Sequence, residues 1–117
     1  MIALHHPEVI DVYRLKQALK HQNRLTLANV LDKINSGFYV LLRASESTLT
    51  IHPMADSIHI AQAAGKMSDI DEVIACVGSI AKEQGKKYIT VKGRKGWNKV
   101  LKPFGFEPNE YYLRKKI

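Results

Sequence analysis

The stretch SIHIAQAAGKMSDIDEVIACVGSIAKEQGKKYITV, residues 57–91, holds the pattern that decides the fold. Ser57–Ala61 alternates between polar and apolar residues, as a half-buried strand does. An apolar stripe at helical spacing follows over residues 70–81, and Gly85 supplies a stop after that helix. Tyr88–Val91 is a second strand, of the buried type. A strand, a helix and a strand in this order predict a parallel pair joined by a right-handed crossover.

The flanking residues predict the other elements. Ser68, with Asp71 three residues later, is typical of the capping box that starts a helix. Hydrophobic periodicity predicts a strand at 2–4, helices at 7–20 and 25–35, strands at 38–43 and 48–52, a short helix from Trp97 that ends before Pro103 and Gly105, and a strand at 111–114. The predicted fold class is α/β, in the order (β)ααβββαβαβ, with helices on both faces of a mixed central sheet.

Length and composition indicate one globular domain over residues 1–117. Apolar residues make up 45% of the chain and charged residues 25%, which is ordinary globular composition. Cys76 is the single cysteine, so no internal disulfide can form. No apolar run approaches the roughly 20 residues that cross a bilayer, and the first residues do not resemble a signal peptide. We therefore expect the protein in the cytoplasm.

The net charge of +7 is unevenly distributed. Residues 82–117 contain eleven Lys or Arg and three acids, a net charge of +8, whereas residues 1–81 have a net charge of −1. A basic cluster of this kind attracts polyanions such as the CoA pyrophosphate, nucleic acid or an acidic protein surface. A solvated surface explains it equally well.

The segment GRKGWNKVLKPFGF, Gly93 to Phe106, and the strand–helix–strand unit before it resemble the GNAT superfamily of N-acetyltransferases. The Gly-Arg-x-Gly-Trp stretch also resembles small GNAT-like proteins that tailed phages and prophages encode. The resemblance implies a GNAT-like fold, acetyl-CoA or CoA as the cofactor, and a parallel strand pair that splays apart to admit the pantetheine arm. On that pattern the cleft is expected between Ser57–Ala61 and Tyr88–Val91.

The resemblance also implies a pyrophosphate loop that opens the long helix, with the pattern Q/R-x-x-G-x-G/A. Gln62 and Gly65 match its first and fourth positions, but Met67 occupies the sixth. Backbone amides and the helix N-terminus would hold the phosphates. The candidate cofactor-binding residues are Gln62, Gly65, Lys66, Met67 and Ser68. A loop in which Gly65 only permits a turn is the alternative.

The catalytic positions of the family have changed in this chain. Leu101 stands where the family usually carries its general acid tyrosine, and Arg94 stands at the position of a frequent asparagine. Replacements would be His59 as a general base on a central strand, and Tyr111 or Tyr112 as an acid. A surface or packed role for His59 is the alternative.

Other candidates are weaker in chemistry. Trp97 lies among basic residues and could contact a partner, or it could plug the core beside the last helix. A basic patch is predicted from Lys92, Arg94, Lys95, Lys99 and Lys102. No metal site is expected, because His5 and His6 have no further ligand at suitable spacing.

Three functions follow from these observations. The first is a catalytically degenerate phage or prophage protein that acts through protein contacts, as a virion-associated or assembly component. The second is an active CoA-dependent N-acyltransferase with non-standard catalytic residues. The third is a nucleic-acid-binding module that uses the basic patch, with affinity that falls steeply with salt. The changed catalytic positions favour the first.

Overall fold

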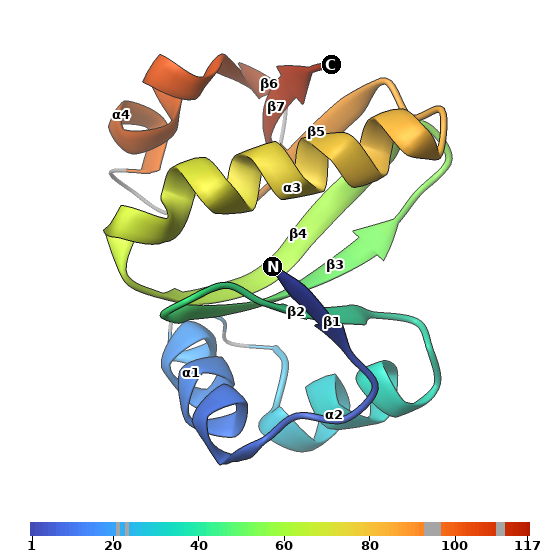
Figure 1. Cartoon of the computed structure of the whole chain (residues 1–117), viewed down its shortest axis with the longest axis vertical. Helices are drawn as coiled ribbons and strands as arrows, with labels where there is room; N and C mark the ends of the chain where they lie inside the picture. The colour runs from blue at the N-terminus through green and yellow to red at the C-terminus, as the bar shows by residue number, and fades with distance from the viewer. Residues whose placement is uncertain (21, 23, 93–96, 110–111) are drawn as a thin grey trace.

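The computed structural model describes residues 1–20, 22, 24–92, 97–109 and 112–117. The helices are α1 (Val9–Leu19), α2 (Leu27–Asn35), α3 (Ile70–Glu83) and α4 (Trp97–Leu101), with short 3-10 helices η1 (Met67–Asp69) and η2 (Lys102–Phe104). The strands are β1 (Ile2–Leu4), β2 (Val40–Arg43), β3 (Ser47–Pro53), β4 (Ser57–Gly65), β5 (Tyr88–Val91), β6 (Phe106–Asn109) and β7 (Tyr112–Lys116). These strands form one sheet in the order β1-β2-β3-β4-β5-β7-β6 (Figure 1).

One parallel pair lies inside an otherwise antiparallel sheet. β4 and β5 pair in parallel from Ser57 opposite Tyr88 to Ile60 opposite Val91. The other neighbouring strands pair antiparallel. α3 is the crossover between β4 and β5, so the strand–helix–strand unit predicted from residues 57–91 is confirmed, as are the mixed sheet and the α/β class.

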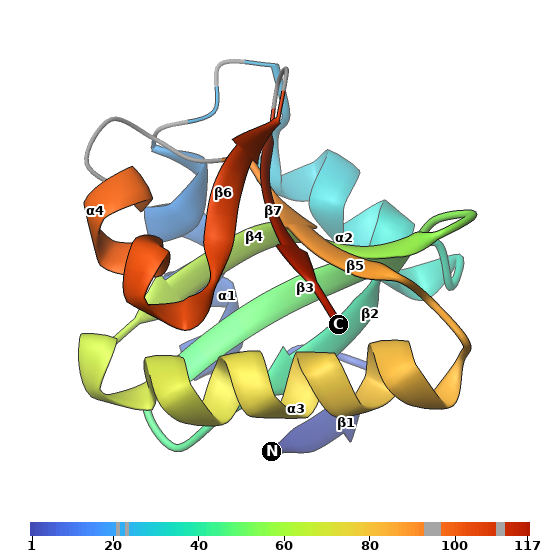
Figure 2. The same ribbon diagram turned by 90° about the horizontal axis from the view of Figure 1, so that it is seen from above.

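Helices cover both faces of the sheet. α3 lies against one face, and α1 and α2 lie against the other (Figures 1 and 2). The core on the α3 side includes Ile58, Ile89 and Val77, which are fully buried. The smaller core on the other side is built around Leu15 and Val30. Alternation along β4 therefore sends Ile58 toward α3 and His59 toward the opposite face.

The helix starts differ in part from the prediction. α2 begins after Thr26, whose hydroxyl accepts a hydrogen bond from the amide of Asn29 at 3.1 Å, so the predicted start at residue 25 was two residues early. The predicted N-cap of the long helix was wrong. Ser68 lies within η1, and α3 follows Asp69, which makes no side-chain cap bond. The carboxylate of Asp69 instead accepts from the amide of Glu46 at 2.7 Å and from the hydroxyl of Ser47 at 2.8 Å.

Two strand assignments were also incomplete. β4 continues to Gly65, four residues beyond its predicted end, and β6 was not predicted at all. β6 was missed because a proline, here Pro108, is unfavourable in most strands. β6 pairs with β7 alone, at the edge of the sheet, where a residue without an amide hydrogen is tolerated. No helix in the described part of the chain has the length and apolar character that crossing a membrane requires.

Candidate functional site: a cleft where two parallel strands part

The site begins where β4 and β5 stop pairing. Their last pair is Ile60 with Val91, while β4 runs on to Gly65. At the same point Ile60 pairs with Ile51 and Gln62 pairs with Thr50, so one residue of β4 between them, Ala61, has no partner on β3. An extra residue of this kind is a β-bulge, which bends a strand. The two strands therefore part at the bulge.

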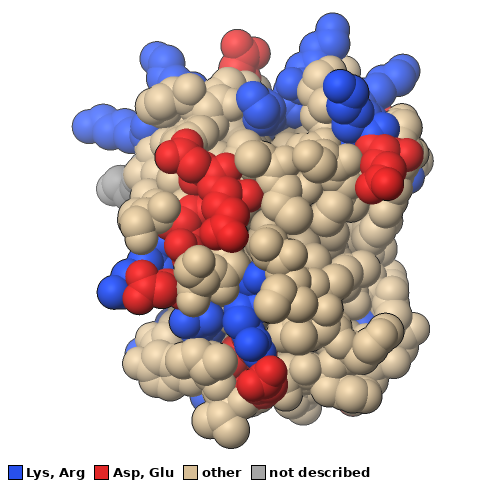
Figure 3. All heavy atoms as spheres, in the orientation of Figure 1, with Lys and Arg blue, Asp and Glu red and all other residues tan. Residues whose placement is uncertain are grey.

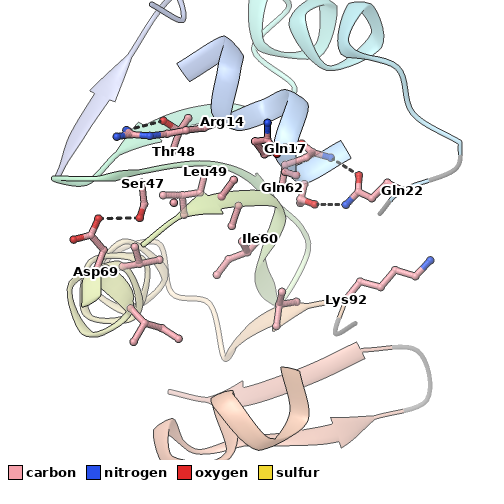
Figure 4. A pocket seen from close by; sticks show the side chains of 18 of the residues that line it. Arg14, Gln17, Gln22, Ser47, Thr48, Leu49, Ile60, Gln62, Asp69 and Lys92 are labelled. Atoms are coloured by element: carbon pink, nitrogen blue, oxygen red, sulfur yellow. Dashed lines mark hydrogen bonds between the residues drawn. The ribbon is translucent and has the colours of Figure 1, made fainter. Parts of the chain in front are cut away.

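The predicted position of the cleft was wrong, because the cleft begins only where the two predicted strand segments stop pairing. Ser57–Ala61 and Tyr88–Val91 were expected to stand apart, but the first four residues of each pair with one another. The divergence begins after these pairs. A cleft of about 1360 Å³ lies there, lined by residues of β4, the start of α3, α1, the α1–α2 connection and the end of β5 (Figure 4).

Gly65 has a structural reason to be glycine. Its φ is +147°, and a Cβ there would come within 2.3 Å of Ser47 Oγ and 2.4 Å of the Glu46 carbonyl oxygen. The backbone of the β2–β3 turn thus lies directly against Gly65. The amide of Lys66 also donates to Ser47 Oγ at 3.2 Å. These contacts support the alternative interpretation, in which Gly65 only permits the turn. They also occupy the backbone amide of Lys66, which was expected to bind phosphate.

Two backbone amides that could donate hydrogen bonds to a ligand lie just before α3. Among the described residues, no acceptor contacts the amides of Met67 and Ser68, and both side chains are exposed. The ammonium of Lys66 is exposed and lies 3.1 Å from the carboxylate of Glu46. The carboxylate of Asp69 is buried and held by the β2–β3 turn, so it does not oppose an anion at the loop surface as an exposed acid would.

Gln62 lies within β4 and not in a loop. It is buried, and its side-chain Nε2 donates to Gln22 Oε1 at 3.3 Å (Figure 4). Its side-chain oxygen accepts from the hydroxyl of Thr50. Gln22 in turn donates to the carbonyl of Ala61, the bulged residue, at 3.0 Å. These contacts fasten the α1–α2 connection onto β4 beside the point where β4 turns away from β5.

His59 lies at the same point, on the face opposite α3. Its Nδ1 is 2.8 Å from Thr90 Oγ1, and its ring meets that of Tyr112 edge to face at a centroid distance of 5.2 Å. Burial lowers the pKa of His59 below its ordinary value, and electrostatic interaction with His52 and Lys92 lowers it further. The imidazole is therefore neutral at pH 7. Nε2 has no partner in the described part of the chain.

The structure brings together two of the predicted catalytic candidates, His59 and Tyr112; Tyr111 lies outside the described residues. Leu101, at the family's acid position, is 4% exposed and belongs to the core on the α3 side. Trp97 is half-buried and packs against that same core while lining the cleft.

Of the predicted basic patch, Lys92, Lys99 and Lys102 are exposed, and Arg94 and Lys95 lie outside the described residues. Figure 3 shows Lys and Arg side chains gathered at the top of the molecule, the end where Figure 1 places α4, β6 and β7. The uneven charge along the sequence is thus also uneven in space.

Sequence reasoning missed Thr90 and Gln22. Successive residues of a strand point to opposite faces of the sheet, so Thr90 points away from the face of Ile89 and lies on the same face as His59. This alternation could have identified Thr90 from the sequence. Gln22 lies in a polar connection without periodicity, and nothing in the sequence marks its contact with β4.

No protein-family model matches the sequence, and a search of curated proteins finds no match to it. Solved structures do match. A CoA-bound acetyltransferase of Bacillus subtilis is 11% identical and superposes with a TM-score of 0.71 over 99% of this chain and 97% of its own. Ard1 from Thermoplasma volcanium is 11% identical, with a TM-score of 0.69 over 96% and 95% of the two chains.

A third match is a GNAT family acetyltransferase from Brucella melitensis in complex with acetyl-CoA. It is 10% identical, with a TM-score of 0.60 over 96% of this chain and 85% of its own. Superposition over most of both chains, at identities this low, establishes the fold alone. The chain has the GNAT acetyltransferase fold.

Proposed function

We propose that the protein is an acetyl-CoA-dependent N-acyltransferase. The observation that carries the proposal is the parting of β4 and β5 after Ile60 and Val91, where a cleft opens beside the neutral imidazole of His59. Solved structures of the same fold hold CoA or acetyl-CoA.

The residues of the cleft fit such a ligand. Beyond Ile60, no strand in the described part of the chain pairs with β4 on the β5 side. The carbonyl of Ala61 accepts from Gln22, and the β4 backbone after Ala61 is available to an extended amide-bearing arm. The amides of Met67 and Ser68 and the ammonium of Lys66 stand at the start of α3, where an anion is favoured. When bound, acetyl-CoA supplies an activated acetyl thioester.

His59 is the residue suited to take the proton of an attacking amine. In the tautomer in which Nδ1–H donates to Thr90 Oγ1, the lone pair is on Nε2. Because burial keeps the ring neutral at pH 7, it can accept a proton without first losing one. The hydroxyl of Thr90 can accept a hydrogen bond from Nδ1–H in this tautomer, and Tyr112 packs edge to face against the ring.

A second candidate is a GNAT scaffold that acts through protein contacts, as the resemblance to phage proteins led us to predict. Leu101, buried at the usual acid position, favours it, because that side chain supplies no proton to a leaving thiolate. A thiol with a pKa of about 8.5 needs no such donor to leave at neutral pH, so this observation does not exclude catalysis. The virion-associated role stays a prediction.

The decisive experiment is calorimetric titration with acetyl-CoA and CoA at physiological salt, followed by chromatographic measurement of free CoA released with a panel of amines. We expect micromolar binding, weakened severalfold in Lys66→Gln and unchanged in Lys82→Gln, whose exposed side chain is on α3 away from the cleft. His59→Gln should retain binding and lose transfer by a factor of roughly 10²–10⁴.

His6→Gln is the matched histidine control, since His6 is exposed and does not line the cleft. Absence of binding at millimolar acetyl-CoA would reject the proposal and leave the scaffold candidate. Binding without transfer to any amine would show a CoA-binding protein that is not an acyltransferase.

A further inference from the structure

The cleft has two ends of different charge. The acids that line it among the described residues are Glu46 and Asp69, both at the end near the start of α3. Asp69 is held by Ser47 and the amide of Glu46, and Glu46 pairs with Lys66. Figure 4 shows Asp69 and Ser47 on one side of the cleft, and Gln22, Gln62 and Lys92 on the other.

The other end, next to His59, carries positive charge. Lys20, Arg24 and Lys92 line it and are exposed, and no described carboxylate lines the cleft there. Lys92 is close enough to His59 to depress its pKa. Lys20 and Arg24 flank Gln22, which is anchored to β4 at Ala61, two residues after His59. Three cations therefore line this end of the cleft, and Lys92 among them acts directly on His59.

Aromatic side chains line this same end. Phe38 is 46% exposed and stacks on the ring of His52 at a centroid distance of 4.0 Å, and both line the cleft. His52 lies on β3, opposite His59 in the β3–β4 register. Lys33 Nζ also lies over the Phe38 ring, 4.3 Å from its centroid, so the faces of the ring are in contact with Lys33 and His52. The exposed edge of Phe38 is the part that an aromatic or apolar group can meet, in an edge-to-face contact.

We infer that the acceptor is a small amine that carries a carboxylate, with an aromatic side chain, and not a polycationic amine. This inference rests on the proposed function. A carboxylate near Lys92, Lys20 and Arg24 is attracted, and its amine is held toward His59 Nε2. A polyamine would meet the same cations without a carboxylate to balance its charge.

The transfer step balances with these groups alone. The neutral amine nitrogen forms a bond to the thioester carbonyl carbon, and the carbon–sulfur bond breaks with its electron pair remaining on sulfur. The proton leaves the nitrogen for His59 Nε2 and passes to water, and water protonates the thiolate. No oxidant or reductant takes part.

The test uses pairs of acceptors that differ only in the carboxylate: phenylalanine with phenethylamine, and tryptophan with tryptamine. We expect at least a tenfold higher kcat/KM for the carboxylate member of each pair. Lys92→Gln should reduce that preference about fivefold by raising KM for phenylalanine, with KM for phenethylamine little changed. Lys82→Gln should keep the preference. An equal or reversed preference in the wild-type protein would overturn the inference.

A second readout does not need transfer. The side-chain NMR signals of His52 and His59 are followed while phenylalanine or phenethylamine is added to the cofactor-free protein. Saturable shifts with phenylalanine alone support the inference even if acetyl-CoA does not bind, in which case only the proposed function fails. Acetyl transfer without a preference for the carboxylate-bearing acceptor rejects the inference but supports the proposed function. Absence of shifts together with absence of phenylalanine acetylation also rejects the inference.

Discussion

At the scale of single residues, the buried carboxylate of Asp11 joins three elements. On α1, its oxygens accept from Arg43 Nε of β2 at 3.0 Å and from Thr48 Oγ1 of β3 at 2.6 Å, and from the amide of Glu8 at 2.9 Å. Burial raises the pKa of Asp11, but these hydrogen bonds outweigh burial and lower the pKa to about 2. Asp11 therefore holds α1 in place beneath the cleft.

We predict that Asp11→Asn lowers the free energy of unfolding by roughly 2–4 kcal/mol at pH 7, because it leaves Arg43 without its buried partner. Urea denaturation measures this loss. Since the folded pKa is depressed, the contribution of the charge is present above the unfolded pKa of about 3.9 and is lost as pH falls toward about 2. The difference between wild type and variant should shrink over that range.

Asp32→Asn is the control for Asp11, because Asp32 is an exposed aspartate on α2. We expect it to change stability by less than about 0.5 kcal/mol. A difference between wild type and Asp11→Asn that stays constant from pH 7 to the acid limit would show that shape, and not charge, makes Asp11 important.

At the scale of elements, the junction between β4 and α3 is set by one glycine. Gly65 brings the end of β4 against Glu46 and Ser47, and the same turn binds Asp69 just before α3. This packing aims the start of α3 at the cleft. The pyrophosphate end of the candidate site therefore depends on a backbone contact that a side chain would break.

We predict that Gly65→Ala destabilises the protein by roughly 2–4 kcal/mol, because the new Cβ overlaps the β2–β3 turn and φ is positive. Gly78→Ala is the matched control. Gly78 is inside α3, and a Cβ there meets only Ile89 Cδ1 at an ordinary 3.8 Å. Since alanine favours helix over glycine, that variant should gain about 0.5–1 kcal/mol. Thermal or urea unfolding of both variants checks the pair.

Equal effects of the two substitutions would contradict this account of Gly65. The result also bears on cofactor experiments, because a Gly65 variant that binds CoA weakly reports on folding as well as on phosphate contact. Lys66, whose side chain is exposed, gives the cleaner variant for measuring CoA affinity.

At the scale of the whole molecule, the sheet consists of two parts joined by a short seam. β1–β4 form one part and β5, β7 and β6 the other, and the pairs between them run from Ser57 with Tyr88 to Ile60 with Val91. α3 spans both parts (Figure 2). A ligand in the cleft contacts both sides of the seam, so its binding should stabilise the complete fold.

We predict that CoA raises the thermal midpoint with its concentration. At 100 times the dissociation constant the gain is about 2.7 kcal/mol, which corresponds to roughly 10 °C or more for a domain of this size. Differential scanning fluorimetry measures it, with pantetheine as the control that lacks the nucleotide and pyrophosphate. A midpoint that stays unchanged at millimolar CoA would argue against occupancy of the cleft.

Several features of this protein were determined by the sequence itself, because they depend on local periodicity. Alternation in residues 57–61, the helical stripe of 70–81 and the stop at Gly85 predicted the central parallel unit that the structure confirms. In the sequence, His59 also alternates with Ile58 and Ile60, and this pattern by itself places His59 on the opposite face of the strand from these two residues. Local patterns of this kind report which side of an element is buried.

Tertiary structure alone decided the rest. Strand β6 exists in spite of Pro108 because it lies at a sheet edge, and the cleft opens after Ile60 because of a bulge that no periodicity marks. The local sequence around Asp69 is typical of the start of a helix. In the fold, however, its carboxylate accepts from the amide of Glu46, 23 residues away along the chain. The contacts of His59 with Thr90 and Tyr112 join strands that are distant in sequence, and only the folding of the sheet brings them together.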